Sequence, residues 1–296
     1  MQNILSNLRK KYERSYGFAV FDLDVEENED TVVVRGEVLT EKQKEEAISE
    51  IKNACGKKVE DSISVLGDVN SQEIGWASVK ADIVDLKSRF VPTSVMNGRI
   101  LKRICVTQAE KGEVLRVLFQ KENQILVQSG DLTLGWVDSA DVDLQQESLR
   151  DKWRGGTVAV PDELIPVDFS EENFINAAEK FLGVKYILGA KSGAAIDCSG
   201  FTQTVYKNAF NIILPKHSWD QKKLGAMVGL SEAETGDLVF MKNGETATKH
   251  VGIWEKLGDR GNIIHASHAF GKVIRQSADE VFEKYDLAEV RRIVKK

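Results

Sequence analysis

The spacing of apolar residues changes twice along the 296-residue chain, and these changes limit the folds that it can adopt. Up to residue 68, helical and alternating patterns follow one another. Residues 74–145 contain only short apolar runs, and a mixed pattern follows from residue 170. The length alone favours two domains and allows three small ones. Because no single period runs through the chain, we expect three modules of α+β, β and α+β class.

The first 68 residues predict a small α+β domain. Its expected elements are a helix over 3–14, strands over 18–25 and 31–38, a helix that begins at Thr40, and a strand over 59–66. Gln43 is the expected capping-box partner of Thr40. The strand VVVRGEV and the segment GKKVEDSISVL resemble a BON domain. A generic α+β spacer is the alternative for these residues.

Residues 72–145 predict a small all-β domain, because no helical pattern occurs there. The expected strands contain residues 81–86, 112–118, 124–128 and 135–137. The motifs Gly112-Glu113-Val114-Leu115 and Gly135-Trp136-Val137 are similar to those of a bacterial SH3-like barrel, in which Trp136 would belong to the core. Two of the four prolines and a glycine pair fall within residues 146–169, which we interpret as a linker.

Composition excludes several classes of protein. Forty Lys and Arg face 46 Asp and Glu, a net charge of −6, so we expect no nucleic-acid partner. No apolar run approaches the ~20 residues of a membrane-spanning helix. The first residues also lack the apolar core of a signal peptide. We therefore expect a cytoplasmic protein, or an extracytoplasmic one if a signal was removed before Met1.

Cysteine and histidine narrow the search for a chemical site. Cys55, Cys105 and Cys198 lie far apart, which excludes a disulfide framework and a zinc site of CxxC type. All four histidines fall between His217 and His268. Because they form no HxxxH or HxH pair, we expect neither a metal nor another cofactor.

Cys198 has the sequence surroundings of a nucleophile. It follows a loop of small residues, 192–195, and precedes a helix expected over 201–208. A helix N-terminus and a neighbouring imidazolium both stabilise a thiolate and lower the thiol pKa. Gly200 and the small loop residues would let a substrate approach closely. Cys55 and Cys105 lack this context and are expected in the core.

Six short motifs follow one another in order between about residues 174 and 276. They are Leu182-Gly183-Val184-Lys185-Tyr186, Asp197-Cys198-Ser199-Gly200-Phe201, Leu214-Pro215-Lys216 with Gln221, Gly236-Asp237-Leu238-Val239-Phe240, His250-Val251-Gly252-Ile253 and Ile264-His265-Ala266. This order resembles the NlpC/p60 family of papain-like cell-wall peptidases. The resemblance implies a papain-like α+β domain over residues 170–296. The apolar spacing of Phe174, Ala177, Ala178 and Phe181 predicts its first helix, which Ser170 would cap.

The resemblance also implies a catalytic role for several residues. Cys198 would be the nucleophile, His250 the general base, and His265 the group that orients the His250 ring. Adjacent antiparallel strands around residues 239–240, 251–253 and 263–264 would bring the two histidines together. The Tyr186 hydroxyl and the backbone N–H of Cys198 would stabilise the oxyanion.

Other residues would surround the substrate. Asp197 and Ser199 flank the nucleophile and would hold the free amino end of a peptide. His217 and Trp219 are possible lining residues of the cleft. His268 is expected to be an exposed loop residue.

The resemblance implies hydrolysis of amide bonds in peptidoglycan stem peptides, at the γ-D-glutamyl–diamino acid bond. The SH3-like module and the stretch Leu214 to Gln221 resemble the subgroup that trims peptides with a free N-terminal L-Ala, which would suit recycling of released muropeptides. Two other functions stay open. One is an acyltransferase or amidase that acts on a lipid or another amide with the same site, and the other is a non-catalytic wall-binding adaptor. The sequence leaves the oligomeric state open.

Overall fold

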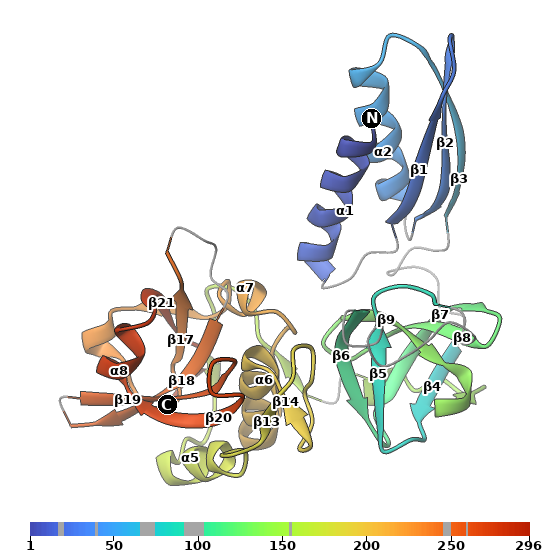
Figure 1. Cartoon of the computed structure of the whole chain (residues 1–296). Helices are drawn as coiled ribbons and strands as arrows, with labels where there is room; N and C mark the ends of the chain where they lie inside the picture. Colours follow the sequence, from blue (N-terminus) through green and yellow to red (C-terminus); the bar gives the residue numbers. More distant parts are fainter. Residues whose placement is uncertain are drawn as a thin grey trace. The chain divides into compact units, whose positions relative to one another are not determined.

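The computed structural model describes residues 1–16, 21–38, 41–65, 75–91, 104–153, 156–244, 250–258 and 260–296. The chain divides into two compact units, which Figure 1 colours in sequence order. The first unit contains Met1–Val106 and Glu110–Trp153, and the second contains Thr107–Ala109 and Arg154–Lys296. None of the helices in the described ranges is long and apolar enough to span a bilayer.

The N-terminal part of the first unit has two helices on one face of a three-stranded sheet (Figure 1). Its elements are α1 (Gln2–Tyr16), β1 (Phe21–Glu27), β2 (Thr31–Val38), α2 (Glu41–Ala54) and β3 (Lys58–Val65). Strand β2 pairs antiparallel with β1 and parallel with β3. Apolar residues of both helices, including Leu5 and Ile51, pack on Val32 and Val34 of the sheet. The predicted order of elements is confirmed; residues 18–20, Thr40 and Leu66 lie outside the described residues.

The rest of the first unit is dominated by a seven-stranded antiparallel sheet. Its strands are β4 (Gly75–Val79), β5 (Ile83–Lys87), β6 (Cys105–Glu110), β7 (Val114–Lys121), β8 (Gln124–Gln128), β9 (Leu134–Asp138) and β10 (Val142–Gln145). Their order is β10-β4-β7-β8-β9-β5-β6. Trp136 is buried, with the rings of Phe90 and Phe119 edge-on at 5.7 and 6.2 Å. The expected burial of Trp136 is therefore confirmed.

The predicted linker is divided between the units. A short helix, α4 (Arg150–Trp153), ends the first unit. In the second unit, β11 (Thr157–Val158) pairs with β15 (Ile212–Ile213), and β12 (Ile165–Pro166) pairs with β22 (Val294–Lys295). These two pairs attach the segment before residue 170 to the C-terminal domain.

An eight-stranded sheet forms the centre of the second unit. Its strands are β13 (Lys185–Tyr186), β14 (Ala195–Ile196), β16 (Ala226–Val228), β17 (Leu238–Lys242), β18 (His250–Leu257), β19 (Arg260–Ser267), β20 (Lys272–Ser277) and β21 (Asp286–Arg292). Their order is β14-β13-β20-β19-β18-β17-β21-β16. The expected antiparallel neighbours β17, β18 and β19 are confirmed.

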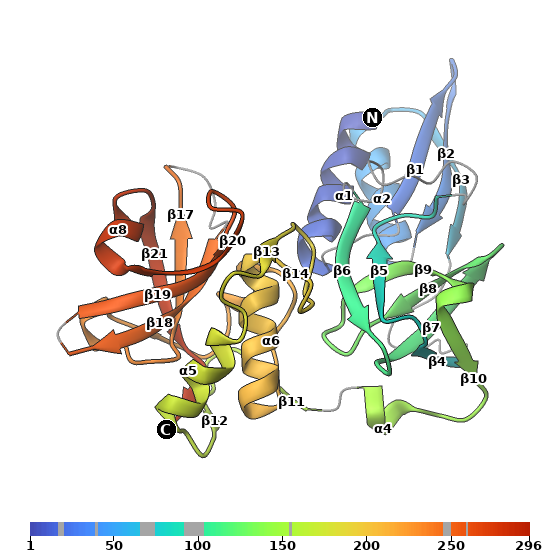
Figure 2. The ribbon, with the colours of Figure 1, turned by 60° about the horizontal axis from the view of Figure 1, so that its bottom comes forward.

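Successive side chains of each strand point to opposite faces of this sheet. Both faces carry apolar residues. Leu238 and Phe240 of β17 face the cluster that contains α5 (Glu171–Glu179) and α6 (Cys198–Phe210), whereas Val239 and Met241 face α8 (Ala278–Phe282). Figure 2 shows the sheet between α6 and α8. Ser170 caps α5 through Asn173 N–H, as predicted. The fold is thus a sheet with helices on both sides, and α6 begins at the predicted nucleophile.

Candidate active site

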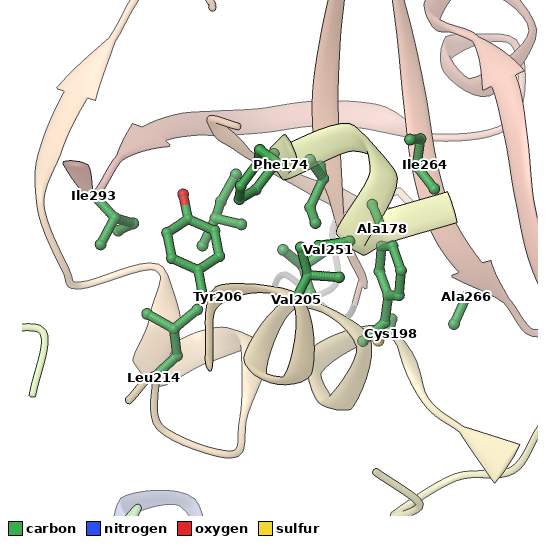
Figure 3. Close-up of a cluster of buried hydrophobic side chains, with 14 of the residues drawn as sticks. Phe174, Ala178, Cys198, Val205, Tyr206, Leu214, Val251, Ile264, Ala266 and Ile293 are labelled. Atoms are coloured by element: carbon green, nitrogen blue, oxygen red, sulfur yellow. The ribbon is translucent and has the colours of Figure 1, made fainter. Parts of the chain in front are cut away.

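Cys198 is the first residue of α6, and its helix start is fixed by local hydrogen bonds. The side chain of Asp197 accepts a hydrogen bond of 2.6 Å from Gly200 N–H, which satisfies one of the free donors of the first turn. Cys198 is 6% exposed and joins the cluster that also contains Val251 and Ile264. Figure 3 shows Cys198 at the start of the helix, which carries Val205 and Tyr206 further along.

Gly200 has a different use from the one expected. A β-carbon at residue 200 would overlap the carbonyl oxygen of Ala190, so the missing side chain lets the loop before Cys198 pack on the helix. The residue is buried. The expectation that Gly200 makes room for a substrate is therefore wrong, because the protein's own backbone fills that space.

The surroundings of Cys198 favour the protonated thiol at rest. Burial, followed by the charge of the Asp197 carboxylate, raises the pKa of Cys198 to about 12. Lys216 and the backbone N–H groups of Val251 and Ser199 act in the opposite direction, since each stabilises the thiolate. Burial therefore outweighs the decrease expected from the helix N-terminus. A thiolate at this position needs a proton acceptor beside it.

His250 and His265 are hydrogen-bonded to each other. Nε2 of His250 lies 2.7 Å from Nδ1 of His265, and Nε2 of His265 lies 3.1 Å from Oε1 of Gln276. An amide oxygen only accepts, so His265 carries its proton on Nε2 and accepts on Nδ1. His250 then donates from Nε2, and its Nδ1 keeps a free lone pair. This tautomer is the one that can take a proton from a thiol.

Both imidazoles are neutral in the resting site. Burial lowers the pKa of His250 to about 3, and His265 contributes to the decrease. Burial also lowers the pKa of His265 to about 4, although the hydrogen bond to Gln276 opposes this shift. Because Val251 follows His250 and its N–H bonds the thiol, the start of β18 lies next to Cys198. The site therefore pairs a neutral thiol with a neutral base.

Gly252 makes room for this histidine pair. A β-carbon at residue 252 would lie 2.5 Å from Cγ2 of Ile263 and 3.1 Å from Cβ of His265. Both distances are shorter than a normal carbon contact. The glycine in the His250-Val251-Gly252 motif thus lets β19 approach closely enough for the two rings to bond.

Two tyrosines lie near Cys198. Burial raises the pKa of Tyr186, and Cys198 raises it further, so its hydroxyl stays a neutral donor. Tyr285 follows α8, and its ring stacks on the His250 ring with a centroid distance of 5.2 Å and an interplanar angle of 22°. Neither Tyr285 nor Gln276 was expected from the sequence. Both reach the site through strand and helix packing, for which no local motif exists.

Asp197 and Ser199 are engaged within the protein. The Asp197 carboxylate accepts from Lys216 Nζ at 2.7 and 2.8 Å, from Gly189 N–H at 2.7 Å and from Ser199 Oγ at 3.2 Å, in addition to Gly200. Two carboxylate oxygens have about four lone-pair positions, so these donors occupy them. Asp197 therefore organises the loop around Cys198. The role of Asp197 and Ser199 in binding a peptide amine stays a prediction.

The other two histidines, His217 and His268, each contact an aromatic ring. His217 precedes α7 (Ser218–Gln221), and its ring stacks on Trp219 with centroids 4.2 Å apart. Trp219 is 37% exposed, and a place for this pair in the substrate cleft stays a prediction. His268 is exposed, and its ring lies edge-on to Tyr186 at 5.4 Å. In the described part of the chain, no three His, Cys, Asp or Glu side chains gather as metal ligands would.

Comparison with known proteins places this site in a family. The profile of the NlpC/P60 family matches residues 183–292, which include Cys198, His250 and His265. An Escherichia coli K12 relative, "Murein DD-endopeptidase MepS/Murein LD-carboxypeptidase", is 38% identical over 38% of this chain and 57% of its own length. The "Gamma-D-glutamyl-L-lysine dipeptidyl-peptidase" of Bacillus cereus is 38% identical over 33% of this chain and 29% of its own length.

A third relative is covered more completely. The "Probable endopeptidase NlpC" of Escherichia coli K12 is 34% identical over 38% of this chain and 70% of its own length. In contrast, the chain spans little more than half of the first relative and less than a third of the second. Through its C-terminal domain, the chain belongs to the NlpC/P60 family.

Proposed function

We propose that this protein is a cysteine peptidase that hydrolyses the γ-D-glutamyl–diamino acid bond of peptidoglycan stem peptides with a free N-terminal L-Ala. One observation carries the proposal: a hydrogen-bonded His250–His265 pair lies on strands beside a cysteine at a helix N-terminus. The names of two relatives, a murein endopeptidase and a γ-D-glutamyl-L-lysine dipeptidyl-peptidase, support this substrate class.

The first half of the reaction forms an acyl-enzyme. Nδ1 of His250 accepts the Cys198 proton as the sulfur attacks the γ-carbonyl carbon of D-glutamate. The carbonyl π electrons move to oxygen, and the Tyr186 hydroxyl with the Cys198 backbone N–H donates to that oxyanion. When the intermediate collapses, the C–N bond breaks and His250 returns the proton to the leaving amine. A thioester of Cys198 remains.

Water completes the cycle. His250 takes a proton from the water molecule that attacks the thioester, and the second tetrahedral intermediate releases the γ-carboxylate of D-glutamate and the Cys198 thiol. His265 keeps the His250 ring in one tautomer through both steps, because its own Nε2–H is committed to Gln276. Apart from water, each step uses only side chains and backbone groups of this domain.

The proposal also covers the two modules of the first unit. The antiparallel sheet of residues 75–145, with Trp136 buried between two aromatic rings, supports an SH3-like module. The order of elements in residues 2–65 supports a BON-like module. An enzyme restricted to released muropeptides would serve peptide recycling in the cytoplasm, which cell fractionation with an antibody to the chain would test.

Substrate choice tests the proposal. The full chain is incubated with L-Ala-γ-D-Glu-diaminopimelate, its L-lysine analogue, the N-acetylated forms of both, and cross-linked sacculi. We expect release of the free diamino acid from the unblocked peptides at more than ten times the rate from the acetylated forms. Equal rates on acetylated peptides or on sacculi would contradict the requirement for free L-Ala. Turnover of an acyl-lipid without turnover of any peptide would contradict the peptidase proposal itself.

A further inference from the structure

Tyr285 covers one face of the proposed general base. It lies between α8 and β21, where its backbone N–H donates to the carbonyl of Val281 at 3.0 Å. Its ring stacks on His250 at 5.2 Å and 22°, whereas the His265 ring meets His250 edge-on at 72°. The imidazole thus has one nitrogen bonded to His265 and one face against an aromatic ring.

We propose that Tyr285 is a positioning residue whose aromatic face stabilises the His250 imidazolium that forms when Cys198 loses its proton. A cation within about 6 Å of an aromatic centroid is attracted by the negative face of the ring. The two rings are nearly parallel, and their centroids lie within this distance of each other. The contact therefore becomes stronger when His250 gains a proton, which favours proton transfer from Cys198 to His250.

This support matters because the site otherwise disfavours the cation. Burial lowers the pKa of His250 to about 3, and burial raises the pKa of Cys198 to about 12. Transfer of a proton from the thiol to the imidazole must offset both desolvation costs. An aromatic face offers partial compensation without bringing a competing carboxylate into the site.

The phenol of Tyr285 remains neutral in this arrangement. Burial raises its pKa and the neighbouring Cys198 raises it further, so the ring acts as a neutral π-system at neutral pH. The titratable groups around the His250–Cys198 pair come from several elements: His265 on β19, Tyr186 on β13, and Asp197 with its partner Lys216 beside α6. Phenylalanine would keep the aromatic face and lose only the hydroxyl.

The inference rests on the proposed role of His250 as base, and its test needs no substrate. Iodoacetamide alkylation of Cys198 in the full chain is followed by mass spectrometry between pH 5.5 and 10, in the wild type, Tyr285→Phe and Tyr285→Leu. Near-UV circular dichroism of each variant is the control for loss of folding in the second unit, because Cys55 and Cys105 belong to the first unit. Because alkylation reports the thiolate alone, failure on stem peptides would refute the substrate and leave this inference intact.

We expect the alkylation rate of Cys198 in Tyr285→Phe to stay within twofold of the wild-type rate at every pH. Tyr285→Leu should be about five- to tenfold slower at pH 7, the loss of one buried cation–π contact. The difference should shrink toward pH 10, because a growing fraction of the thiol then loses its proton directly to solvent, without the imidazole. A role in folding alone would instead change the rate at Cys198 by the same factor at every pH, and that result would overturn the inference.

A second variant keeps the test valid if Tyr285→Leu does not fold. Trifluorophenylalanine incorporated at position 285 preserves the shape of the ring and weakens its negative face. Cys198 in this variant should be alkylated more slowly at pH 7 than Cys198 in Tyr285→Phe. Equal rates for these two variants would overturn the inference, because the electrostatic character of the ring would then have no effect on the thiolate.

Discussion

Nζ of Lys216 lies 2.7 and 2.8 Å from the two carboxylate oxygens of Asp197, and both residues are buried, at 3% exposed each. Asp197 directly precedes Cys198 in the sequence, and Lys216 precedes α7. Since Asp197 also binds the N–H groups of Gly189 and Gly200, Lys216 neutralises the group that shapes the loop around Cys198.

We predict that Lys216→Met destabilises the C-terminal domain by about 3–5 kcal/mol, because it leaves a buried carboxylate without its counterion. Urea unfolding followed by circular dichroism measures this change. Lys216→Arg is the matched control, and it should lose much less because it keeps the charge. A loss below about 1 kcal/mol in Lys216→Met would show that the pair is dispensable.

Gln276 should matter as an acceptor. Its Oε1 lies 3.1 Å from Nε2 of His265 and selects the tautomer that leaves Nδ1 of His250 free. We predict that Gln276→Leu lowers kcat about tenfold, with little change in KM. Gln276→Glu keeps an acceptor at the same distance and should retain most of the activity. If Gln276→Leu turns over as fast as the wild type, the tautomer does not depend on this residue.

The space at Gly252 predicts a combined effect on stability and activity. In Gly252→Ala the added carbon meets Ile263 and His265 at 2.5 and 3.1 Å, so β19 must move. We expect a loss of about 1–3 kcal/mol in unfolding free energy and a lower kcat. Gly193→Ala is the control, because a β-carbon there meets nothing within 4 Å. Unchanged turnover in Gly252→Ala would contradict the close approach of the two strands.

The buried histidines predict acid sensitivity. The folded-state pKa values of His250 and His265 are lowered to about 3 and 4 by burial, below the value near 6.5 of an unfolded histidine. The unfolded state therefore binds more protons, so the stability present above pH 6.5 is lost as the pH falls toward 4.

Each buried histidine contributes a slope of about 1.4 kcal/mol per pH unit in this range. Unfolding free energies of the wild type and His265→Gln, measured from pH 6.5 to 4.5, should therefore differ in their slope against pH by about 1.4 kcal/mol per pH unit. Parallel curves would show that His265 is already protonated in the folded protein.

Local sequence rules predicted many of the helices and strands, whereas several long-range contacts escaped them. The role of Cys198 as nucleophile stays a prediction. Ser170 as a helix cap, the helix after Cys198 and the strand from Thr31 to Val38 follow from patterns within a few residues. Motif order predicted that His250 and His265 would meet, and strands β18 and β19 bring them together.

Gln276 and Tyr285 illustrate what the sequence alone could not supply. Gln276 reaches His265 only because β20 pairs with β19 in a register that sets Ile274 opposite His265. Tyr285 depends on how the turn after α8 packs on β18. The burial that raises the pKa of Cys198 is also a property of the folded cluster, so a helix-dipole argument from the sequence predicted the wrong direction.

Product identification by mass spectrometry tests the central claim most directly. The full chain is incubated with L-Ala-γ-D-Glu-diamino acid-D-Ala, and the products are compared with those of Cys198→Ala. We predict one cleavage, which gives L-Ala-D-Glu and the diamino acid-D-Ala dipeptide, and no cleavage by the variant. Cleavage at another bond, or the same products from Cys198→Ala, would contradict the account.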